Sequence, residues 1–394
     1  MNSKQPAFVR DSTDETANFS ERLTVQVSLG PRSYEIDIVS DRLAWLARYL
    51  ENCLVRLPSP PRRPYQLLIV TDGNVAKPHA ATVRHSLDNA GWHTESVELQ
   101  PGEQSKSLAV VSGIYDRLVE MQAGRHTIVV AVGGGVVGDV AGFVAATYAR
   151  GIPFIQVPTS LLAHVDSSVG GKVGVNHPRG KNLIGAFHQP IGVFIDTVTL
   201  ETLSDRDYTS GLAEVIKYGV ILDDEFFAYL EENVGRLAAR APNVLRRVIA
   251  RCCRLKADIV EADEEERTGL RAVLNYGHTF AHAFEALCGY GELLHGEAVA
   301  VGMVCAGRLA EFRQLIDSSF SARQCSLIDA VGLPTRLPAS IKLTATDVLD
   351  RMRLDKKTVA GQLHFVLPTE LGHVEVYSDV PETDVRSALD EVLA

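Results

Sequence analysis

Short apolar runs alternate with helical patterns through the first half of the chain. The predicted strands are Gln66–Thr71, Thr94–Leu99, Thr127–Val132 and Pro153–Val157, and the predicted helices are Lys77–Ala90, Lys106–Met121 and Val136–Arg150. Strands that alternate with helices are typical of a parallel sheet with helices on both faces. Ligands of such sheets bind beyond the carboxyl ends of the strands, so the polar segments after these strands are the first candidates for function.

Two segments depart from this alternation. Thr24–Val39 predicts a separate hairpin with its turn near Gly30 and Pro31. Thr159–Gln189 is rich in Gly, Ser, Asn and Lys and shows no periodicity, although ordered patterns surround it. A structureless loop of this length inside a compact region is usually functional or disordered, and its apolar anchors favour function.

After the short strand Phe194–Asp196 the pattern becomes helical. The predicted helices are Gly211–Leu222, Asp224–Arg240, Asn243–Glu266, Leu270–Leu287, Gly296–Leu315, Ser319–Val331 and Thr344–Arg353, with one strand-like run, Gln362–Leu367. We therefore predict an α/β domain with a Rossmann-like parallel sheet over residues 23–199 and an all-α domain over residues 200–394. Residues 1–22 are polar and predict a mobile tail.

Composition and charge narrow the classes of function. The formal net charge is −10, which argues against a nucleic-acid or membrane-surface binder because both need basic patches. The six cysteines form no CxxC pair and indicate buried thiols in a reducing compartment, so we expect a cytoplasmic protein. The chain has neither an apolar run long enough to span a bilayer nor an apolar secretory segment near its start.

A glycine cluster ends one predicted strand and opens the next helix. Segment 133–139 (GGGVVGD) matches the spacing GxGxxG, and glycines there let the backbone approach a pyrophosphate. The acidic residue expected about 20 residues later is missing, however, and Asp139 follows at once, so a plain tight turn is the alternative. Four further polar residues lie in loops after predicted strands, and together with the cluster they favour a dinucleotide: Asp72, Asn74, Glu103 and Lys106.

Positive charge gathers in the patternless segment. Lys172, Arg179 and Lys181 lie there against a single acid, Asp166. A flexible backbone with concentrated positive charge suits a phosphate or carboxylate ligand, although a solvated loop with ordinary lysines is the alternative.

Polar residues recur at helical spacing in the second half. Arg271, Asn275, His278 and His282 are spaced i, i+4, i+7 and i+11, which on one α-helix predicts a continuous stripe lining a polar cavity. His278 and His282 could share a metal ion, and His295 offers a third imidazole. Spacing leaves open which two histidines bind, and whether Glu214 or Glu297 is the carboxylate ligand.

Seven segments together resemble the 3-dehydroquinate synthase family. They are 133–139 (GGGVVGD), 157–162 (VPTSLL), 165–172 (VDSSVGGK), 180–190 (GKNLIGAFHQP), 211–218 (GLAEVIKY), 274–278 (LNYGH) and 294–297 (LHGE). The similarity runs in unbroken order from about Leu67 to Leu367. Related cyclases that form valiolone resemble DAGxGAK where this chain has DSSVGGK, and they lack the Asn275 and His282 pair.

The resemblance implies a set of site residues. It implies Glu214, His278 and His295 as ligands of Zn²⁺ or Co²⁺, with His282 near the substrate instead. Implied substrate residues are Asp166, Lys172, Lys217, Lys256, Arg271, Asn275, His282 and Lys356, with Arg150 reaching the neighbouring site of a homodimer. Without the resemblance, Lys256 and Lys356 would be taken for exposed lysines. Implied NAD-binding residues are Asp72, Asn74, Glu103, Lys106, Gly134, Gly135, Val136, Asp139, Thr159, Ser160, Lys172, Lys181, Asn182 and Thr202.

The resemblance also implies a reaction in the shikimate pathway of aromatic amino acid biosynthesis. 3-Deoxy-D-arabino-heptulosonate 7-phosphate would be oxidised transiently by NAD⁺, lose phosphate, be re-reduced and close into 3-dehydroquinate. Two residues depart from the family pattern: Val173 and Ser160 stand where threonine is usual. Alternatives are another sugar phosphate cyclase, a metal-dependent glycerol or alcohol dehydrogenase, and a non-catalytic scaffold.

Overall fold

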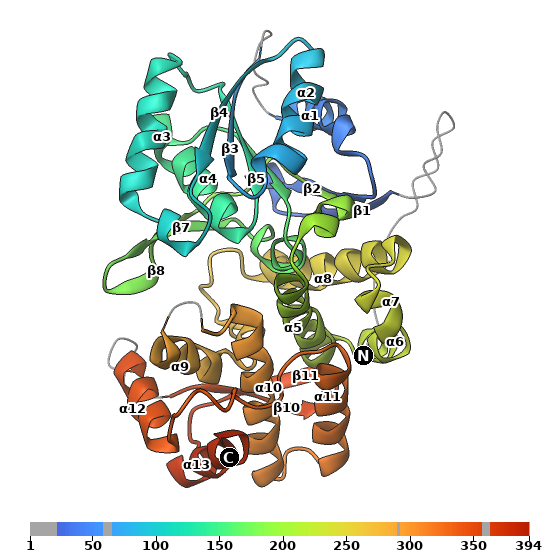
Figure 1. Cartoon of the computed structure of the whole chain (residues 1–394), viewed down its shortest axis with the longest axis vertical. Helices are drawn as coiled ribbons and strands as arrows, with labels where there is room; N and C mark the ends of the chain where they lie inside the picture. Colours follow the sequence, from blue (N-terminus) through green and yellow to red (C-terminus); the bar gives the residue numbers. More distant parts are fainter. Residues whose placement is uncertain (1–21, 58–64, 290–291, 357–362, 394) are drawn as a thin grey trace. The chain divides into compact units, whose positions relative to one another are not determined.

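The computed structural model describes residues 22–57, 65–289, 292–356 and 363–393, and the predicted tail over residues 1–22 lies almost wholly outside them. The chain forms two compact units (Figure 1). Unit 1 comprises the described residues within Met1–Leu203 together with Pro242–Glu265, and unit 2 comprises Ser204–Ala241 and the described residues within Glu266–Ala394. Among the described residues, no helix is long and apolar enough to cross a membrane.

Unit 1 is built on a seven-stranded sheet with the order β1-β2-β9-β6-β5-β3-β4. Its strands are β1 (Leu23–Val27), β2 (Tyr34–Val39), β3 (Gln66–Asp72), β4 (His93–Leu99), β5 (Ile128–Gly133), β6 (Phe154–Pro158) and β9 (Gly192–Asp196). Only β1 pairs antiparallel, so the predicted parallel sheet is confirmed. The predicted separate hairpin is wrong in one respect, because β2 also pairs with β9 and extends the main sheet.

Helices cover both faces of this sheet because successive strand residues point to opposite sides. The longer helices are α1 (Leu46–Val55), α2 (Ala81–Asn89), α3 (Leu108–Glu120), α4 (Gly135–Thr147) and α8 (Pro242–Ala262). In β3, Leu67 and Ile69 pack with α1 and α2, whereas Leu68 and Val70 pack with α3 and α4. The described residues of unit 1 also form short helices: η1 (Gly30–Arg32), η2 (Leu43–Trp45), η3 (Ala76–Ala80), η4 (Glu103–Ser105), η5 (Tyr148–Arg150), η6 (Ala163–Ser167) and η7 (Thr197–Thr202).

The segment predicted to lack regular structure is ordered. It contains η6 and an antiparallel hairpin of β7 (Lys172–His177) and β8 (Gly180–Phe187). Glycines hide its strand pattern: a Cβ on Gly174 would lie 2.6 Å from the Ile184 carbonyl oxygen, so the close pairing of these strands requires glycine.

Unit 2 is mainly helical. Its elements are α5 (Asp205–Leu222), α6 (Asp224–Glu232), α7 (Val234–Ala238), η8 (Leu270–Asn275), α9 (His278–Cys288), α10 (His295–Phe312), α11 (Ser318–Ala330), α12 (Ala345–Lys356) and α13 (Glu382–Leu393). A two-stranded hairpin, β10 (Phe365–Glu370) with β11 (His373–Tyr377), accompanies these helices. The helix α8 follows α7 in the sequence but belongs to unit 1.

Candidate functional site

Three helices of unit 2 bring one carboxylate and two imidazoles together. Glu214 lies on α5, and His278 and His295 begin α9 and α10. One ligand atom from each lies within 4.8 Å of the others. The Oε1 atom of Glu214 lies 3.6 Å from Nε2 of His278 and 3.8 Å from Nε2 of His295. Ligand atoms placed about 2.1 Å from a tetrahedral ion are roughly 3.4 Å apart, so a divalent ion fits among these three groups.

The buried Glu214 carboxylate lacks a hydrogen-bond donor for its Oε1 atom among the described residues. Its side chain is 1% exposed, and Oε1 accepts no hydrogen bond within the described part of the chain. The ammonium of Lys217, one helical turn further along α5, forms an ion pair with Oε2. A buried anion is stable only when it is paired or coordinates a metal, so this orphaned oxygen is itself an indication of a cation site.

The other nitrogen of each imidazole is already engaged. Nδ1 of His278 donates to the Tyr276 carbonyl at 3.1 Å, and Nδ1 of His295 lies 3.7 Å from the Glu285 carboxylate. Partners of this kind fix the tautomer and leave Nε2 as the ligand atom. Glu285 was missed in the sequence, although it lies seven residues after His278 on the same face of α9.

Burial and charge set the protonation of these imidazoles. Burial lowers the pKa of His278 well below its usual value, and the ammonium of Lys217 lowers it further. Burial also opposes charge on His295, but the carboxylates of Glu285 and Glu214 outweigh it and raise the pKa of that imidazole. The neutral form of His278 is the form that can bind a metal.

Glycines allow the three helices to approach one another. The hydroxyl of Ser210 on α5 accepts from the Gly296 amide at 3.0 Å, and a Cβ on Gly296 would lie 1.8 Å from the Ser210 carbonyl oxygen. A Cβ on Gly302 would lie 2.2 Å from the carbonyl oxygen of Gly277. Any larger residue at these positions would push α10, which carries His295, away from the helices that carry Glu214 and His278.

The predicted continuous stripe on one helix is wrong. Arg271 and Asn275 lie on the 3-10 helix η8, and a new helix, α9, begins at His278. Gly277 separates the two elements with φ +79°, a conformation that ends helices. The break places His278 at the first turn of α9, where its ring also lies 5.4 Å from that of His295.

The remaining candidates of unit 2 occupy different surroundings. Glu297 accepts from Arg206 and from the Leu294 amide and so caps α10, while Glu214 faces the imidazoles. The His282 ring lies edge-on to the His278 ring at 5.5 Å and is exposed. The Arg271 side chain is buried, with Nε 3.4 Å from a Glu266 oxygen. The side chain of Lys356, at the end of α12, lies outside the described residues.

In unit 1, a buried lysine connects several of the predicted cofactor residues. The ammonium of Lys106 contacts the carboxylate of Asp139 and lies 2.5 Å from Oδ1 of Asn182. Asn176 links this group to Glu103 through a 2.6 Å hydrogen bond. Burial raises the pKa of Asp139, and the Lys106 ammonium offsets only part of that effect. Segments far apart in the sequence therefore meet at the start of α4.

The glycine cluster and the residues after β6 lie side by side. The Thr159 amide donates to the Gly133 carbonyl at 3.0 Å, and a Cβ on Gly134 would lie 3.4 Å from the Ser160 hydroxyl. Gly135 and Val136 begin α4, so the amides of its first turn lie at this edge of the sheet. Two other predicted residues also have hydrogen-bond partners: Asp72 accepts from the Asn74 amide, and the Thr202 hydroxyl lies 2.6 Å from Nε2 of His79.

The cationic segment of unit 1 begins at an ion pair. The ammonium of Lys256 on α8 donates to both the carboxylate and the carbonyl oxygen of Asp166, each at 2.7 Å. Lys172 is exposed at the start of β7, and Lys181 is exposed on β8. Val173 is buried against α4, where a Cβ on Gly142 would meet it, so this departure from the family pattern lies in the apolar core.

Arg150 lies on a tight turn. The helix predicted to reach it ends at Thr147, and Ala149 (φ 48°) and Arg150 (φ 66°) both have left-handed backbone conformations. Arg150 is therefore exposed at the end of the short, distorted helix η5 and not on the face of α4.

Comparisons with known proteins show which family the chain is similar to. A family described as 3-dehydroquinate synthase N-terminal matches residues 96–210, and one described as 3-dehydroquinate synthase C-terminal matches residues 211–358. A 3-dehydroquinate synthase from Desulforamulus reducens is 51% identical over 368 residues, which cover 93% of this chain and 99% of that protein.

Two solved structures share the fold at 27% sequence identity. One is 2-epi-5-epi-valiolone synthase from Streptomyces hygroscopicus subsp. jinggangensis with NAD⁺ and Zn²⁺ bound (TM-score 0.82; 93% of this chain, 98% of that one). The other is 2-deoxy-scyllo-inosose synthase complexed with carbaglucose-6-phosphate, NAD⁺ and Co²⁺ (TM-score 0.81; 94% of this chain, 100% of that one).

Proposed function

We propose, from the premise that this chain belongs to the 3-dehydroquinate synthase family, that Glu214, His278 and His295 hold the divalent metal of that family's reaction. The observation that carries this proposal is the buried Oε1 atom of Glu214. It has no hydrogen-bond donor among the described residues and lies within 3.8 Å of two imidazole nitrogens. The chemistry of one carboxylate and two imidazoles suits Zn²⁺ or Co²⁺.

The reaction is a phosphate elimination that requires a transient oxidation. The chain is a lyase that converts 3-deoxy-D-arabino-heptulosonate 7-phosphate to 3-dehydroquinate and phosphate in the shikimate pathway. When bound, NAD⁺ supplies reversible hydride transfer and the metal supplies Lewis acidity.

Residues of unit 2 near the proposed metal ligands would handle protons and charge. Lys217 neutralises Glu214 and places a buried ammonium beside the ligand set. His282, exposed one turn after His278, is suited to relay a substrate hydroxyl proton to solvent. Asn275, Arg271 and Lys356 would bind hydroxyl and carboxylate groups of the substrate.

Residues of unit 1 would bind the dinucleotide and the phosphate. The first turn of α4 and its glycines would receive the pyrophosphate, because unpaired amides at a helix start attract anions. Lys106 and the polar residues near it would hydrogen-bond to polar groups of NAD⁺. The other residues proposed to take part are Asp72, Asn74, Glu103, Asp139, Thr159, Ser160, Lys181, Asn182 and Thr202. Lys172 would bind the substrate phosphate, and Asp166 with Lys256 would contact the sugar.

We further propose a cytoplasmic homodimer in which Arg150 contributes to the neighbouring site. Its exposed place on a tight turn supports such a role. The six cysteines are free thiols, as a reducing compartment would keep them. In this proposal residues 23–199 form the NAD-binding domain and residues 200–394 the metal- and substrate-binding domain, with α8 contributing to unit 1.

A single assay tests the reaction. Purified protein is given the sugar acid phosphate, and inorganic phosphate and reduced nicotinamide are both followed, with and without NAD⁺ and a chelator. We expect phosphate release that depends on NAD⁺ and metal, with no net accumulation of NADH because the hydride returns to the substrate. Accumulating NADH without phosphate release would instead identify a dehydrogenase.

A further inference from the structure

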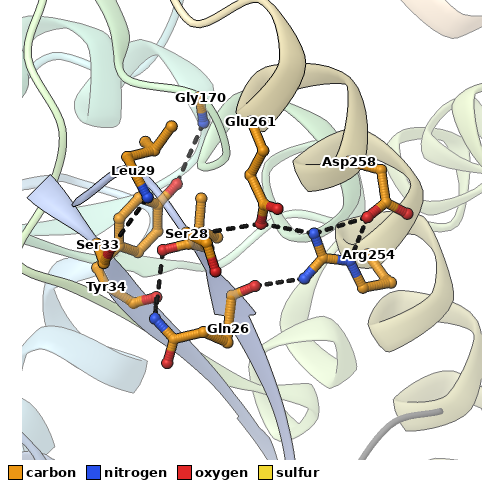
Figure 2. Close-up of polar contacts among 10 residues, drawn as sticks. Gln26, Ser28, Leu29, Ser33, Tyr34, Gly170, Arg254, Asp258 and Glu261 are labelled. Carbon is orange, nitrogen blue, oxygen red and sulfur yellow. Dashed lines mark hydrogen bonds and ion pairs between the residues drawn. The ribbon is translucent and has the colours of Figure 1, made fainter. Parts of the chain in front are cut away.

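Tyr34 contacts the glycine turn that precedes Lys172. It is the first residue of β2 and is 2% exposed, and its hydroxyl accepts a hydrogen bond from the Gly170 amide at 3.3 Å (Figure 2). We propose that Tyr34 is a positioning residue for Lys172, and that the N-terminal hairpin (β1, η1 and β2) braces the phosphate-binding turn. The inference rests on the proposed role of Lys172 in binding the substrate phosphate.

The turn itself has little intrinsic preference for one shape. Gly170 (φ 100°) and Gly171 (φ 66°) both lie in the region that only glycine visits readily. Gln189 contacts the same turn through its side-chain amide, which donates to the Gly170 carbonyl at 3.4 Å. A Cβ on Gly171 would lie 2.7 Å from the Gln189 side chain. Contacts on both sides therefore define the direction in which the chain enters β7 and Lys172.

The hairpin that carries Tyr34 is fixed to α8. Arg254 on α8 donates to the Gln26 carbonyl, and Glu261 accepts from both Arg254 (2.7 Å) and the Ser28 amide (2.9 Å), as Figure 2 shows. The side-chain amide of Gln26 donates in turn to the backbone carbonyl of Tyr34 at 3.1 Å. Tyr34 is thus held at its backbone by a strand that is itself bound to a helix.

A second chain of contacts runs from the hairpin to the same turn. The guanidinium of Arg32 donates two hydrogen bonds, of 3.0 and 2.6 Å, to the Glu264 carboxylate. The same carboxylate accepts from the side-chain amide of Gln189 at 3.1 Å. Since Gln189 also contacts Gly170, the hairpin reaches this turn from both sides.

The other end of the segment is fixed by the same helix. Lys256 of α8 holds Asp166 through two 2.7 Å hydrogen bonds. Segment 166–172 is therefore anchored at Asp166 and at Gly170, two residues before the lysine that would bind the phosphate. Preorganising a cation in this way lowers the entropy cost of binding an anion, which is a reason for the hairpin to be part of the site.

The test measures how tightly inorganic phosphate competes with the substrate. Tyr34→Phe keeps the buried ring and removes only the hydroxyl. We expect the inhibition constant of phosphate to rise about fivefold, because the Gly170 amide loses its partner, and the KM to rise more than kcat falls. NAD⁺ affinity should stay within about twofold. Tyr208→Phe is the matched control: it removes a buried hydroxyl that donates to the Leu237 carbonyl in unit 2, outside the hairpin, and phosphate inhibition should be unchanged.

A double-mutant cycle identifies the residue through which Tyr34 acts. Lys172→Ala should weaken phosphate inhibition about tenfold, and Tyr34→Phe should add less than about a twofold change in that background. If Lys172→Ala weakens inhibition but Tyr34→Phe does not, or if the two effects multiply fully, the positioning role is refuted while the proposed function stands. Unchanged inhibition in Lys172→Ala would refute the role of Lys172 and the inference with it.

A second variant covers the case in which Tyr34→Phe does not fold. Gln189→Ala removes the contact on the other side of Gly170 from a partly exposed position, and the same cycle with Lys172→Ala applies. A weaker phosphate inhibition that disappears in the Lys172→Ala background supports the brace, and full additivity overturns it.

Discussion

At the scale of single residues, the Glu214 carboxylate combines deep burial with incomplete pairing. Its side chain is 1% exposed, and removing an ion from water costs several kcal/mol even after the protein relaxes. Lys217 offsets part of that cost through Oε2, but Oε1 faces two imidazoles that do not donate to it. A divalent cation would satisfy this oxygen and both nitrogens together.

The ligand set predicts different outcomes for two histidines on α9. His278→Ala should lose bound zinc and turnover, because a three-ligand site retains only two ligands. His282→Ala should keep its zinc and lose turnover alone, since His282 lies outside the ligand group. Metal content of the dialysed proteins checks both. Stoichiometric zinc in His278→Ala would refute the ligand assignment.

Glu285 should matter for metal affinity without touching the ion. Glu285→Ala removes the carboxylate that lies 3.7 Å from Nδ1 of His295, so the ring loses its orienting partner. We expect about a 10- to 100-fold weaker affinity for zinc in competition with a chromophoric chelator. Glu292→Ala, in the connection between α9 and α10 and outside the ligand group, is the control. Equal affinities in the two variants would contradict the orienting role.

A buried histidine in unit 1 predicts acid sensitivity. Burial lowers the pKa of His164 to about 4, and Nε2 donates to the Pro158 carbonyl. In the unfolded chain the imidazole of His164 takes up a proton near pH 6.5, whereas in the folded protein it stays neutral down to about pH 4. The stability of the folded state against protonation of this group is therefore complete above pH 6.5 and is lost as the pH falls towards 4. Between pH 7.5 and 5 this group should account for roughly 2 kcal/mol of the lost unfolding free energy. Denaturant titrations of the wild type and His164→Gln check it, and the variant should show the smaller pH dependence.

At the scale of elements, glycines decide how closely the ligand-bearing helices approach. Gly296→Ala would place a Cβ 1.8 Å from a carbonyl oxygen of α5. Relieving that overlap means moving α10, and overpacking typically costs about 1–3 kcal/mol. We expect this loss of stability together with weaker zinc binding, measured by denaturant and metal titrations.

Gly235→Ala is the control for that substitution. Gly235 lies within α7 with nothing within 4 Å of its Cβ position, so the change should be neutral or slightly stabilising. A Gly296→Ala variant as stable and as zinc-avid as this control would contradict the close approach of α5 and α10.

The strands of unit 1 were predictable, whereas the geometry of the ligand-bearing elements was not. Uninterrupted apolar runs such as Ile128–Gly133 predict buried parallel strands directly. The break between η8 and α9 was missed because Leu270–Leu287 is helical in its spacing, whereas the turn depends on the left-handed backbone of Gly277 and the close approach of Gly302. The β7–β8 hairpin was missed because its glycines, which the close pairing of the two strands requires, interrupt the apolar pattern of a strand. The candidate metal ligands were left ambiguous by spacing and were singled out by the family resemblance.

At the scale of the whole molecule, the two proposed cofactors should stabilise different units. Zinc at about 100 times its Kd should add roughly 2.7 kcal/mol to the unfolding free energy of unit 2, and NAD⁺ should act in the same way on unit 1. In His278→Ala the zinc effect should vanish and the NAD⁺ effect should remain. Chemical denaturation with each ligand alone measures both, and zinc stabilisation that survives in the variant would place the ion elsewhere.

The position of α8 in the sequence has a consequence for biosynthesis. Unit 1 has all of its sheet strands once Asp196 has been translated, yet the helix that binds its hairpin and holds Asp166 starts only at Pro242. The segments that form α5, α6 and α7 of unit 2 are therefore synthesised before α8 is available to complete the fold of unit 1. A nascent chain stalled at residue 203 should remain sensitive to protease in its hairpin, and one extended past residue 265 should become resistant.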